Sequence, residues 1–326
     1  MLSKEKNKDF TILKIKRAAL FCFGFVFFLF PGQNWYSTVN LNYQSPKVQS
    51  LAVSLPSPAD YPVNFTGIQP PSLTARSVVV LDKDSAVLMY AKNEKIQLLP
   101  ASTVKIMTAL VALDYYSLDD VLMVNEVDNL GQDMKLVKGE KITVKNLLYG
   151  VLVASANDAA VILARNYPGG EKEFVKAMNE KEKDLRLEGS YFVNPTGLDS
   201  DLQGNLLPDY SYTTALDLAR LAAVALKNET ISQMVAIPKI VVSDVDGKIS
   251  HQLFNLNELL GNIEGLRGVK TGWTEDAGEC LVGYVQKDGR GIITVILGSQ
   301  DRFGETTKLI EWVFSNHRWE TFTPSI

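Results

Sequence analysis

The chain of 326 residues has 46% apolar and 21% charged side chains, close to the proportions of an ordinary globular protein. Glycine and proline are not in excess, so most of the chain is expected to be ordered. The length allows one large domain or two small ones. From residue 33 onward, 27 basic side chains stand against 35 acidic ones. This negative balance argues against nucleic acid as a partner.

The N-terminus has the pattern of an export segment. Residues 1–17 carry six basic and two acidic side chains, an unbroken apolar run covers 18–30, and Pro31 and Gly32 end it. Such a run is typical of a signal peptide and is short for a spanning helix, which needs about 20 residues. Because no clear cleavage site follows, residues 1–32 are expected to be either a cleaved signal peptide or an N-terminal membrane anchor. Basic residues stay in the cytoplasm, so the rest of the chain is expected to be extracytoplasmic, either membrane-associated or secreted.

Cysteine and histidine are scarce. The two cysteines lie in the apolar N-terminal run and in an expected strand, and we do not expect them to pair, despite the exported context. The two histidines, His251 and His317, come without an HExxH or CxxC pattern, so the sequence offers little from which to build a zinc site. Neither a metal nor an organic cofactor is expected.

In chain order, residues 33–74 are rich in Ser, Pro, Asn and Gln, which predicts a flexible spacer. Two apolar stretches around a polar turn over 76–93 predict a β-hairpin. A helical period then covers 102–116, short alternating stretches over 121–144 indicate a small β region, and two apolar helices over 144–167 meet near Ser155. An amphipathic surface helix is expected over 169–187.

The second half of the chain contains a helix, several strands and a last helix. The helix over 211–228 is expected to be capped by Thr213 or Thr214. Strands are predicted over 237–243, 268–272, 279–285 and 291–299, and a helix over 305–317. No βαβ alternation occurs. The order predicts an α+β fold, with an antiparallel sheet built from both ends of the chain, flanked by helices, and an inserted helical region. The folded domain is expected over 75–319, with a tail over 320–326.

The first candidate for chemistry is Ser102 with Lys105. Residues three apart share one face of a helix, so the lysine can reach the serine hydroxyl, a weak nucleophile that needs a nearby base. Lysine serves as a base only when burial or another cation lowers its pKa, and the apolar neighbours permit this. By itself the pattern is weak, because Ser102 could simply cap the helix, and Ser3 with Lys6 has the same spacing.

Two further short motifs follow. Ser155-Ala156-Asn157 lies between two apolar helices, where its polar groups either cap the next helix or serve proton transfer and substrate binding. Lys270-Thr271-Gly272-Trp273 lies on an expected strand. There it offers a cation, a hydroxyl and a glycine that lets a ligand approach the backbone, or else simply a lysine that protects a sheet edge.

Taken together, SxxK, SxN and KTG in this order resemble the penicillin-binding protein and serine β-lactamase superfamily. Longer stretches are similar to the low-molecular-mass penicillin-binding proteins, the D-alanyl-D-alanine carboxypeptidases. These stretches include FVNPTGL, TTALDLARLA and GVKTGWTEDAGECLVG, and the similarity runs from about Arg76 to about His317. The resemblance implies a penicillin-sensitive serine peptidase that removes the terminal D-alanine of peptidoglycan stem pentapeptides, with β-lactams as covalent inhibitors.

The resemblance also implies a role for each site residue. Ser102 matches the acylated nucleophile, Lys105 its general base and Ser155 the proton-relay serine. The substrate-binding positions are Asn157, Lys270, Thr271, Gly272, Trp273 and Arg302, with the backbone N–H groups of Ser102 and Trp273 as the oxyanion hole. SAN stands where many relatives have SGN, and the bulky Trp273 occupies a variable position. The β-rich C-terminal domain of many relatives is not expected here, so an N-terminal anchor would provide the tether.

Three other functions fit the sequence less well. A class A-like β-lactamase needs a deacylating glutamate in an ExxxN arrangement, and none is found between the second and third motifs. A Ser-His-Asp hydrolase could use His251, but no GxSxG precedes a helix. A non-catalytic peptidoglycan-binding protein would not need Ser102, Lys105, Ser155 and Lys270 intact.

Overall fold

The computed structural model describes residues 14, 16–17, 60–128, 131–199 and 209–321. The chain divides into two units, residues 1–55 and 56–326. In the first unit, Lys14, Lys16 and Arg17 are helical and exposed. The rest of the expected export segment over 1–32, and the expected spacer up to residue 59, lie outside the described residues. Within the residues that are described, no helix is long and apolar enough to cross a membrane.

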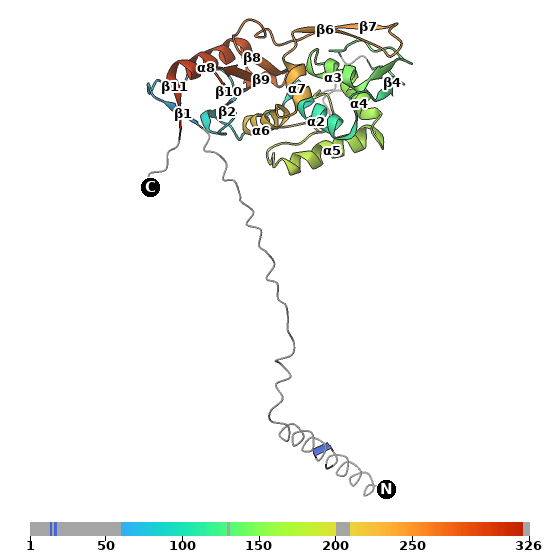
Figure 1. Cartoon of the computed structure of the whole chain (residues 1–326), viewed down its shortest axis with the longest axis horizontal. Coiled ribbons are helices and arrows are strands. Elements are labelled where there is room, and N and C mark those ends of the chain that lie inside the picture. The colour runs from blue at the N-terminus through green and yellow to red at the C-terminus, as the bar shows by residue number, and fades with distance from the viewer. Residues whose placement is uncertain (1–13, 15, 18–59, 129–130, 200–208, 322–326) are drawn as a thin grey trace, which may run out of the picture. The chain divides into compact units, whose positions relative to one another are not determined.

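The second unit is built on a five-stranded antiparallel sheet with the strand order β3-β2-β10-β9-β8 (Figure 1). Strands from the two ends of the unit are neighbours, since β10 pairs with β2 on one side and with β9 on the other. The strand bounds are β2 Ser77–Asp82, β3 Leu88–Lys92, β8 Leu266–Thr274, β9 Gly278–Lys287 and β10 Arg290–Ser299. The predicted hairpin and antiparallel sheet are confirmed.

Both faces of the sheet are buried. Val79 and Leu81 of β2 belong to the larger apolar core, whereas Val78 and Val80 belong to a smaller core that also contains residues of helix α8. This division follows from the period of two along a strand. The sheet therefore lies between α8 and the inserted helical region, as an α+β fold requires.

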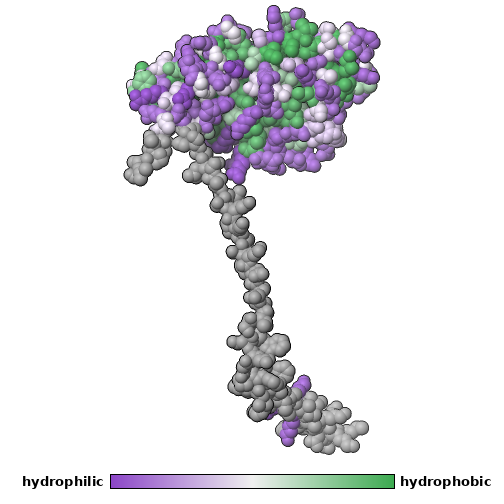
Figure 2. Space-filling view, in the orientation of Figure 1, coloured by the Kyte–Doolittle hydropathy of each residue, from purple (hydrophilic) through white to green (hydrophobic). Residues whose placement is uncertain are grey.

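The inserted region contains helices α2 to α7, and α8 follows the last strand of the sheet. The helix bounds are α2 Lys105–Tyr115, α3 Val144–Leu152, α4 Asn157–Arg165, α5 Gly170–Asp184, α6 Ala215–Ala225, α7 Glu229–Val235 and α8 Arg302–Asn316. Thr214 caps α6, because its side chain accepts a 3.0 Å hydrogen bond from the backbone N–H of Asp217. The small β region consists of β4 Val121–Met123 paired with β5 Lys141–Thr143. Figure 2 shows hydrophilic residues over much of the visible face of this unit, with hydrophobic residues between them.

Four elements were not predicted. They are β1 (Tyr61–Asn64), β7 (Ser250–Phe254), β11 (His317–Glu320) and α7. Strand β1 pairs with β11, and β7 pairs with the predicted strand β6 (Lys239–Ser243). Folded structure thus reaches into the range 33–74 expected to be a spacer, and β11 ends at the first residue of the expected tail. The Ser/Pro-rich composition hides β1, which contains Pro62, because a short two-stranded ribbon leaves little alternation to detect.

Candidate active site

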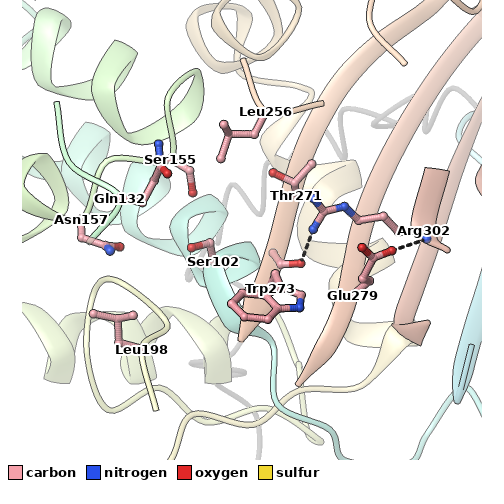
Figure 3. Close-up of a pocket in the computed structure, with 11 residues that line it drawn as sticks. Ser102, Gln132, Ser155, Asn157, Leu198, Leu256, Thr271, Trp273, Glu279 and Arg302 are labelled. Carbon is pink, nitrogen blue, oxygen red and sulfur yellow. Dashed lines mark hydrogen bonds between the residues drawn. The ribbon is translucent and has the colours of Figure 1, made fainter. Parts of the chain in front are cut away.

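A pocket of about 550 Å³ lies where β8 meets the inserted helical region (Figure 3). It is lined by Ser102, Gln132, Ser155, Asn157, Leu198, Leu256, Thr271, Gly272, Trp273, Glu279 and Arg302. Residues of all three sequence motifs are in this list. Figure 3 shows Ser102 between the polar side chains of the helical region and those of the strands.

Ser102 lies in a single 3₁₀ turn, η2 (Ala101–Val104), which leads directly into α2. The turn is closed by Thr103, whose hydroxyl donates a 2.7 Å hydrogen bond to the Pro100 carbonyl. Ala101 has a φ of 47°, in the left-handed region. No side chain caps η2 or α2. The interpretation of Ser102 as a helix cap is therefore wrong.

Lys105 is fully buried, and its Nζ has three polar partners. It lies 2.9 Å from Ser102 Oγ, 2.7 Å from Asn157 Oδ1 and 2.7 Å from the Thr196 carbonyl oxygen. Burial, and next the charge of Lys270, hold the pKa of Lys105 well below its usual range. Nζ donates to all three oxygens, and the contacts with Asn157 and Thr196 hold it beside the Ser102 hydroxyl.

The Thr196 carbonyl is held in place by a turn that Asn194 organises. Asn194 Oδ1 accepts hydrogen bonds from the backbone N–H of Thr196 at 3.1 Å and of Gly197 at 2.7 Å, and its Nδ2 donates to the Leu198 carbonyl at 2.8 Å. Gly197 has a φ of 82°, and a Cβ there would overlap the Ala101 carbonyl. The turn therefore packs directly against the nucleophile loop, and only glycine fits.

Ser155 lies between α3 and α4 with a φ of 59° and is almost fully buried. It caps no helix, since no side chain caps α4. Its hydroxyl accepts a 2.8 Å hydrogen bond from Lys270 Nζ. We expected Ser155 beside Lys105, but within the described residues no hydrogen bond joins the two. The buried Lys270 side chain reaches Ser155 from β8 and takes this position.

Strand β8 brings Lys270, Thr271 and Gly272 to the pocket. Burial, and next the charge of Arg302, lower the pKa of Lys270 to about 7. A Cβ on Gly272 would lie 3.1 Å from the Ser102 backbone nitrogen and 3.0 Å from the Pro100 carbonyl. Glycine at this position lets the strand lie close against the loop that carries the nucleophile.

Arg302, the first residue of α8, points back towards the pocket. Its Nη1 donates a 2.9 Å hydrogen bond to the Gly272 carbonyl, and its guanidinium lies over the Phe303 ring, 4.7 Å from the centroid. Its Nε is buried without a hydrogen-bond partner in the described structure. Trp273 is 62% exposed and forms an apolar wall of the pocket. Arg302 therefore places a cation beside Thr271 and Gly272.

A loop between β4 and β5 forms the wall that carries Gln132. The Gln132 carbonyl accepts a 2.6 Å hydrogen bond from the Asn157 backbone N–H, and its Nε2 donates to the Ala154 carbonyl at 3.1 Å. Met134 and Glu140 lie further along this loop, and both contact His251 of β7. The His251 Nδ1 is 2.8 Å from the Met134 carbonyl oxygen, and its Nε2 is 2.7 Å from Glu140 Oε1. His251 thus supports the loop from the β6–β7 ribbon and does not line the pocket.

The structure brings together every residue that the sequence indicated, either in the pocket lining or, for Lys105 and Lys270, directly behind it. The sequence reasoning missed the Thr196 carbonyl, Gln132 and Glu279. The Asn-x-Thr-Gly pattern within FVNPTGL is typical of a turn, and it is the signal that could have located the carbonyl. No comparable signal marks Gln132 or Glu279, because the pairing of distant segments brings them to the pocket.

A buried Ser–Lys pair, a second serine and a lysine-bearing edge strand on this α+β fold define a serine peptidase of the penicillin-binding type. The family model for D-alanyl-D-alanine carboxypeptidase matches residues 64–301. The chain therefore belongs to the D-alanyl-D-alanine carboxypeptidase family.

Individual relatives are similar over most of the folded unit. A D-alanyl-D-alanine carboxypeptidase DacF of Bacillus subtilis is 34% identical over 74% of this chain, and the chain spans 63% of that relative's length. A D-alanyl-D-alanine endopeptidase of Pseudomonas aeruginosa is 32% identical, over 74% of this chain and 77% of its own length.

Solved structures share the fold. The DD-transpeptidase of Streptomyces K15 matches with a TM-score of 0.69 and 28% identity, over 76% of this chain and all of the other. Penicillin-binding protein D2 of Listeria monocytogenes, in its ampicillin-bound form, matches with a TM-score of 0.64 and 28% identity, over 75% of this chain and all of the other.

Proposed function

We propose that this protein removes the terminal D-alanine from peptidoglycan stem pentapeptides through an acyl-enzyme on Ser102. The observation that carries the proposal is the position of Lys105 Nζ, 2.9 Å from Ser102 Oγ and anchored by Asn157 and Thr196. A buried amine with two of its partners fixed can accept the hydroxyl proton as the oxygen attacks the peptide carbonyl.

In acylation, Ser102 Oγ bonds to the carbonyl carbon of the penultimate D-alanine and its proton passes to Lys105. The carbonyl oxygen becomes an oxyanion, for which the backbone N–H groups of Ser102 and Trp273 are the proposed donors. The C–N bond then breaks, and the leaving amine takes a proton. Ser155 and Lys270, joined by a 2.8 Å hydrogen bond, are the proposed route for that proton. Water completes the cycle when it cleaves the ester.

Substrate orientation is assigned to the strand side of the pocket. The terminal carboxylate carries a negative charge, and Lys270, Thr271 and Arg302 supply two cations and a hydroxyl around Gly272. The amide of Asn157, whose Oδ1 is oriented by Lys105, is proposed to bind the substrate backbone. Trp273 would cover the apolar side of the peptide.

Penicillin presents the same pattern, a carboxylate beside a reactive amide, and is proposed to acylate Ser102 and act as an inhibitor. A class A-like β-lactamase would need a carboxylate that activates deacylating water. None of the four glutamates on α5, which lies between the second and third motifs, lines the pocket: Glu171, Glu173, Glu180 and Glu182. Residues 1–32 are proposed to direct export and, if uncleaved, to hold the protein at the membrane.

Product analysis tests this function. The protein is incubated with a muropeptide pentapeptide, with and without prior penicillin treatment, and the products are separated by mass. Release of one D-alanine per peptide, blocked by a covalent penicillin adduct on Ser102, is the expected result. Binding of muropeptide without product or adduct would instead indicate a non-catalytic peptidoglycan-binding protein.

A further inference from the structure

A buried carboxylate directly follows the second motif. Asp158, the second residue of α4, is 4% exposed and has no part in the reaction described above. Its Oδ1 accepts a 2.9 Å hydrogen bond from the backbone N–H of Met134, and its Oδ2 accepts one of 3.1 Å from that of Leu136. Both donors belong to the loop between β4 and β5 that forms a wall of the pocket. The carboxylate therefore holds this loop through both of its oxygens.

The loop in turn holds the start of α4. The residue before the helix, Ala156, has no side chain that could accept a hydrogen bond, so the first N–H groups of the helix need other partners. The Gln132 carbonyl accepts a 2.6 Å hydrogen bond from the Asn157 N–H, and Asp133 Oδ1 accepts one of 3.3 Å from the Asp158 N–H. Hydrogen bonds thus run in both directions between the loop and the helix, and they fix the two as one unit.

This unit contains the residue that holds the proposed base. Gln132 and Asn157 line the pocket on the same side of Ser102 (Figure 3). The Asn157 Oδ1 lies 2.7 Å from Lys105 Nζ, which in turn lies 2.9 Å from Ser102 Oγ. A continuous path of hydrogen bonds and covalent links therefore leads from the Asp158 carboxylate, through the loop and Asn157, to the proposed nucleophile.

We propose that Asp158 is a positioning residue for acylation: it holds the β4–β5 loop against α4 and so keeps the Asn157 side chain beside Lys105. The proposal rests on the proposed function, because it needs Ser102 to be acylated. An acidic side chain in the first turn of a helix also stabilises that helix, whatever else it does. The two roles differ in what they change: positioning changes the rate of the chemical step, whereas stabilisation changes the fraction of protein that is folded.

Asp217 provides a matched control for the stabilising role. It also lies in the first turn of a helix, α6, and is also 4% exposed. Its Oδ2 accepts hydrogen bonds from a neighbouring segment, from the Gly189 N–H at 2.9 Å and from the Ser190 hydroxyl at 3.0 Å. It does not line the pocket. Asp217→Asn and Asp158→Asn therefore remove the same kind of buried charge, and only the second affects the pocket wall.

The test is acylation by excess penicillin, followed by stopped-flow measurement. The limiting rate at saturating penicillin reports the chemical step, and the amplitude reports the fraction of protein that is able to react. Asp158→Asn should lower the limiting rate about tenfold to a hundredfold, the scale expected for a displaced catalytic group. Asp217→Asn should lower only the amplitude or the unfolding temperature. Equal limiting rates in the two folded variants would overturn the proposal.

The charge of Asp158 also acts on the base, in the opposite direction to the expected loss. Burial, and next the charge of Lys270, lower the pKa of Lys105. The charges of Asp133 and Asp158 raise it. Asp158→Asn therefore favours the uncharged amine, which is the form that accepts a proton. Because this effect increases the amount of active base, it cannot account for a slower chemical step.

A double variant tests the route through Asn157. Asn157→Ala alone should slow acylation, because Lys105 loses one of its anchors. Addition of Asp158→Asn to this variant should slow acylation little further, since the side chain that Asp158 positions is already absent. A full additional loss in the double variant would refute the route and with it the proposal.

Two possible failures are kept apart from this result. If Asp158→Asn does not fold, as judged by circular dichroism, Asp158→Glu is measured in its place. This variant keeps the charge but moves the carboxylate by one methylene group, so it should still slow the chemical step, and a wild-type limiting rate would overturn the proposal. Failure of the proposed function is recognised differently, because the wild-type protein then forms no penicillin adduct at all.

Discussion

The hydroxyl of Ser155 accepts a 2.8 Å hydrogen bond from Lys270 Nζ, across 115 positions of sequence. This contact joins the second motif to the third and leaves Lys105 to Ser102, Asn157 and Thr196. The two buried lysines therefore serve different serines. Their lowered pKa values predict separate effects of pH on the reaction.

The alkaline limb of the pH profile is expected to come from Lys270. Its pKa is lowered to about 7, so the folded protein loses this cation as pH rises through that value. Attraction of the penicillin carboxylate, and with it the second-order rate of acylation, should decline there. Lys270→Arg keeps the charge at all accessible pH and should remove the decline. Stopped-flow acylation from about pH 5 to 10 measures both proteins, and an identical alkaline limb in the variant would refute the assignment.

The same pKa predicts a change in stability. Between about pH 7 and the ordinary lysine value of 10.5, the unfolded chain binds a proton on Lys270 that the folded chain does not. The contribution of this group to the free energy of unfolding therefore rises with pH across that window. As pH falls, the contribution shrinks across the same window and is lost once pH falls through about 7. Urea unfolding of wild-type protein and Lys270→Met at about pH 7 and 9.5 tests the sign. The wild-type protein should gain more stability than the variant over this interval.

Removal of the nucleophile or its base should stop the reaction. Ser102→Ala is expected to abolish both D-alanine release and the penicillin adduct. Lys105→Ala should lower release by about 10²–10⁴-fold, the usual contribution of a positioned general base. Ser117→Ala and Lys172→Ala, at exposed sites, are the matched controls and should keep full activity. Substantial release by the Ser102 variant would exclude the acyl-enzyme.

The turn that holds the Thr196 carbonyl gives a test by matched glycines. Gly197 and Gly247 have φ values of 82° and 70°, so alanine is strained at both. Only at Gly197 does the added Cβ meet the Ala101 carbonyl, whereas nothing lies within 4 Å at Gly247. Gly197→Ala should therefore slow penicillin acylation at least about tenfold, since it displaces the nucleophile loop. Gly247→Ala should acylate at the wild-type rate, and similar rates in the two variants would show that the packing contact is unimportant.

The buried His251–Glu140 pair is expected to stabilise the fold and to take no part in the chemistry. Both ring nitrogens have polar partners, and both side chains are almost fully buried. His251→Ala leaves Glu140 without this partner and should lower the free energy of unfolding by about 2–4 kcal/mol. The folded variant should still form the penicillin adduct on Ser102. Denaturant unfolding and mass spectrometry check both points, and loss of the adduct in a folded protein would contradict this role.

Much of the fold could be predicted because its longer elements have clear periods. The hairpin of β2 and β3, the apolar helices α3 and α4 and the strand β8 follow from alternation or helical spacing. The ribbons β1–β11 and β6–β7 could not be predicted in full, because their partner strands are short and lie far apart or carry mixed side chains. Their pairing depends on tertiary contacts that no local window contains.

The functional site likewise has residues that local motifs reveal and contacts that only the folded structure reveals. Side chains in short motifs, such as Ser102 with Lys105, are visible as local patterns. The partner of Ser155 was predicted to be Lys105 and is Lys270, because the side chain that fills a buried site depends on how β8 packs against the helices. The Thr196 carbonyl was missed for another reason: every residue has a carbonyl, so residue type carries no information about it.

The central place of β10 in the sheet, between β2 and β9, has a consequence for biosynthesis. A ribosome delivers the chain from its N-terminus, so the nucleophile loop is made well before β10. Until β10 arrives, β2 lacks one of its two neighbours, and β8 and β9 lack the strand that joins them to it. The pocket also needs Arg302 of α8, which follows β10, so it cannot be complete until nearly the whole folded unit has been synthesised.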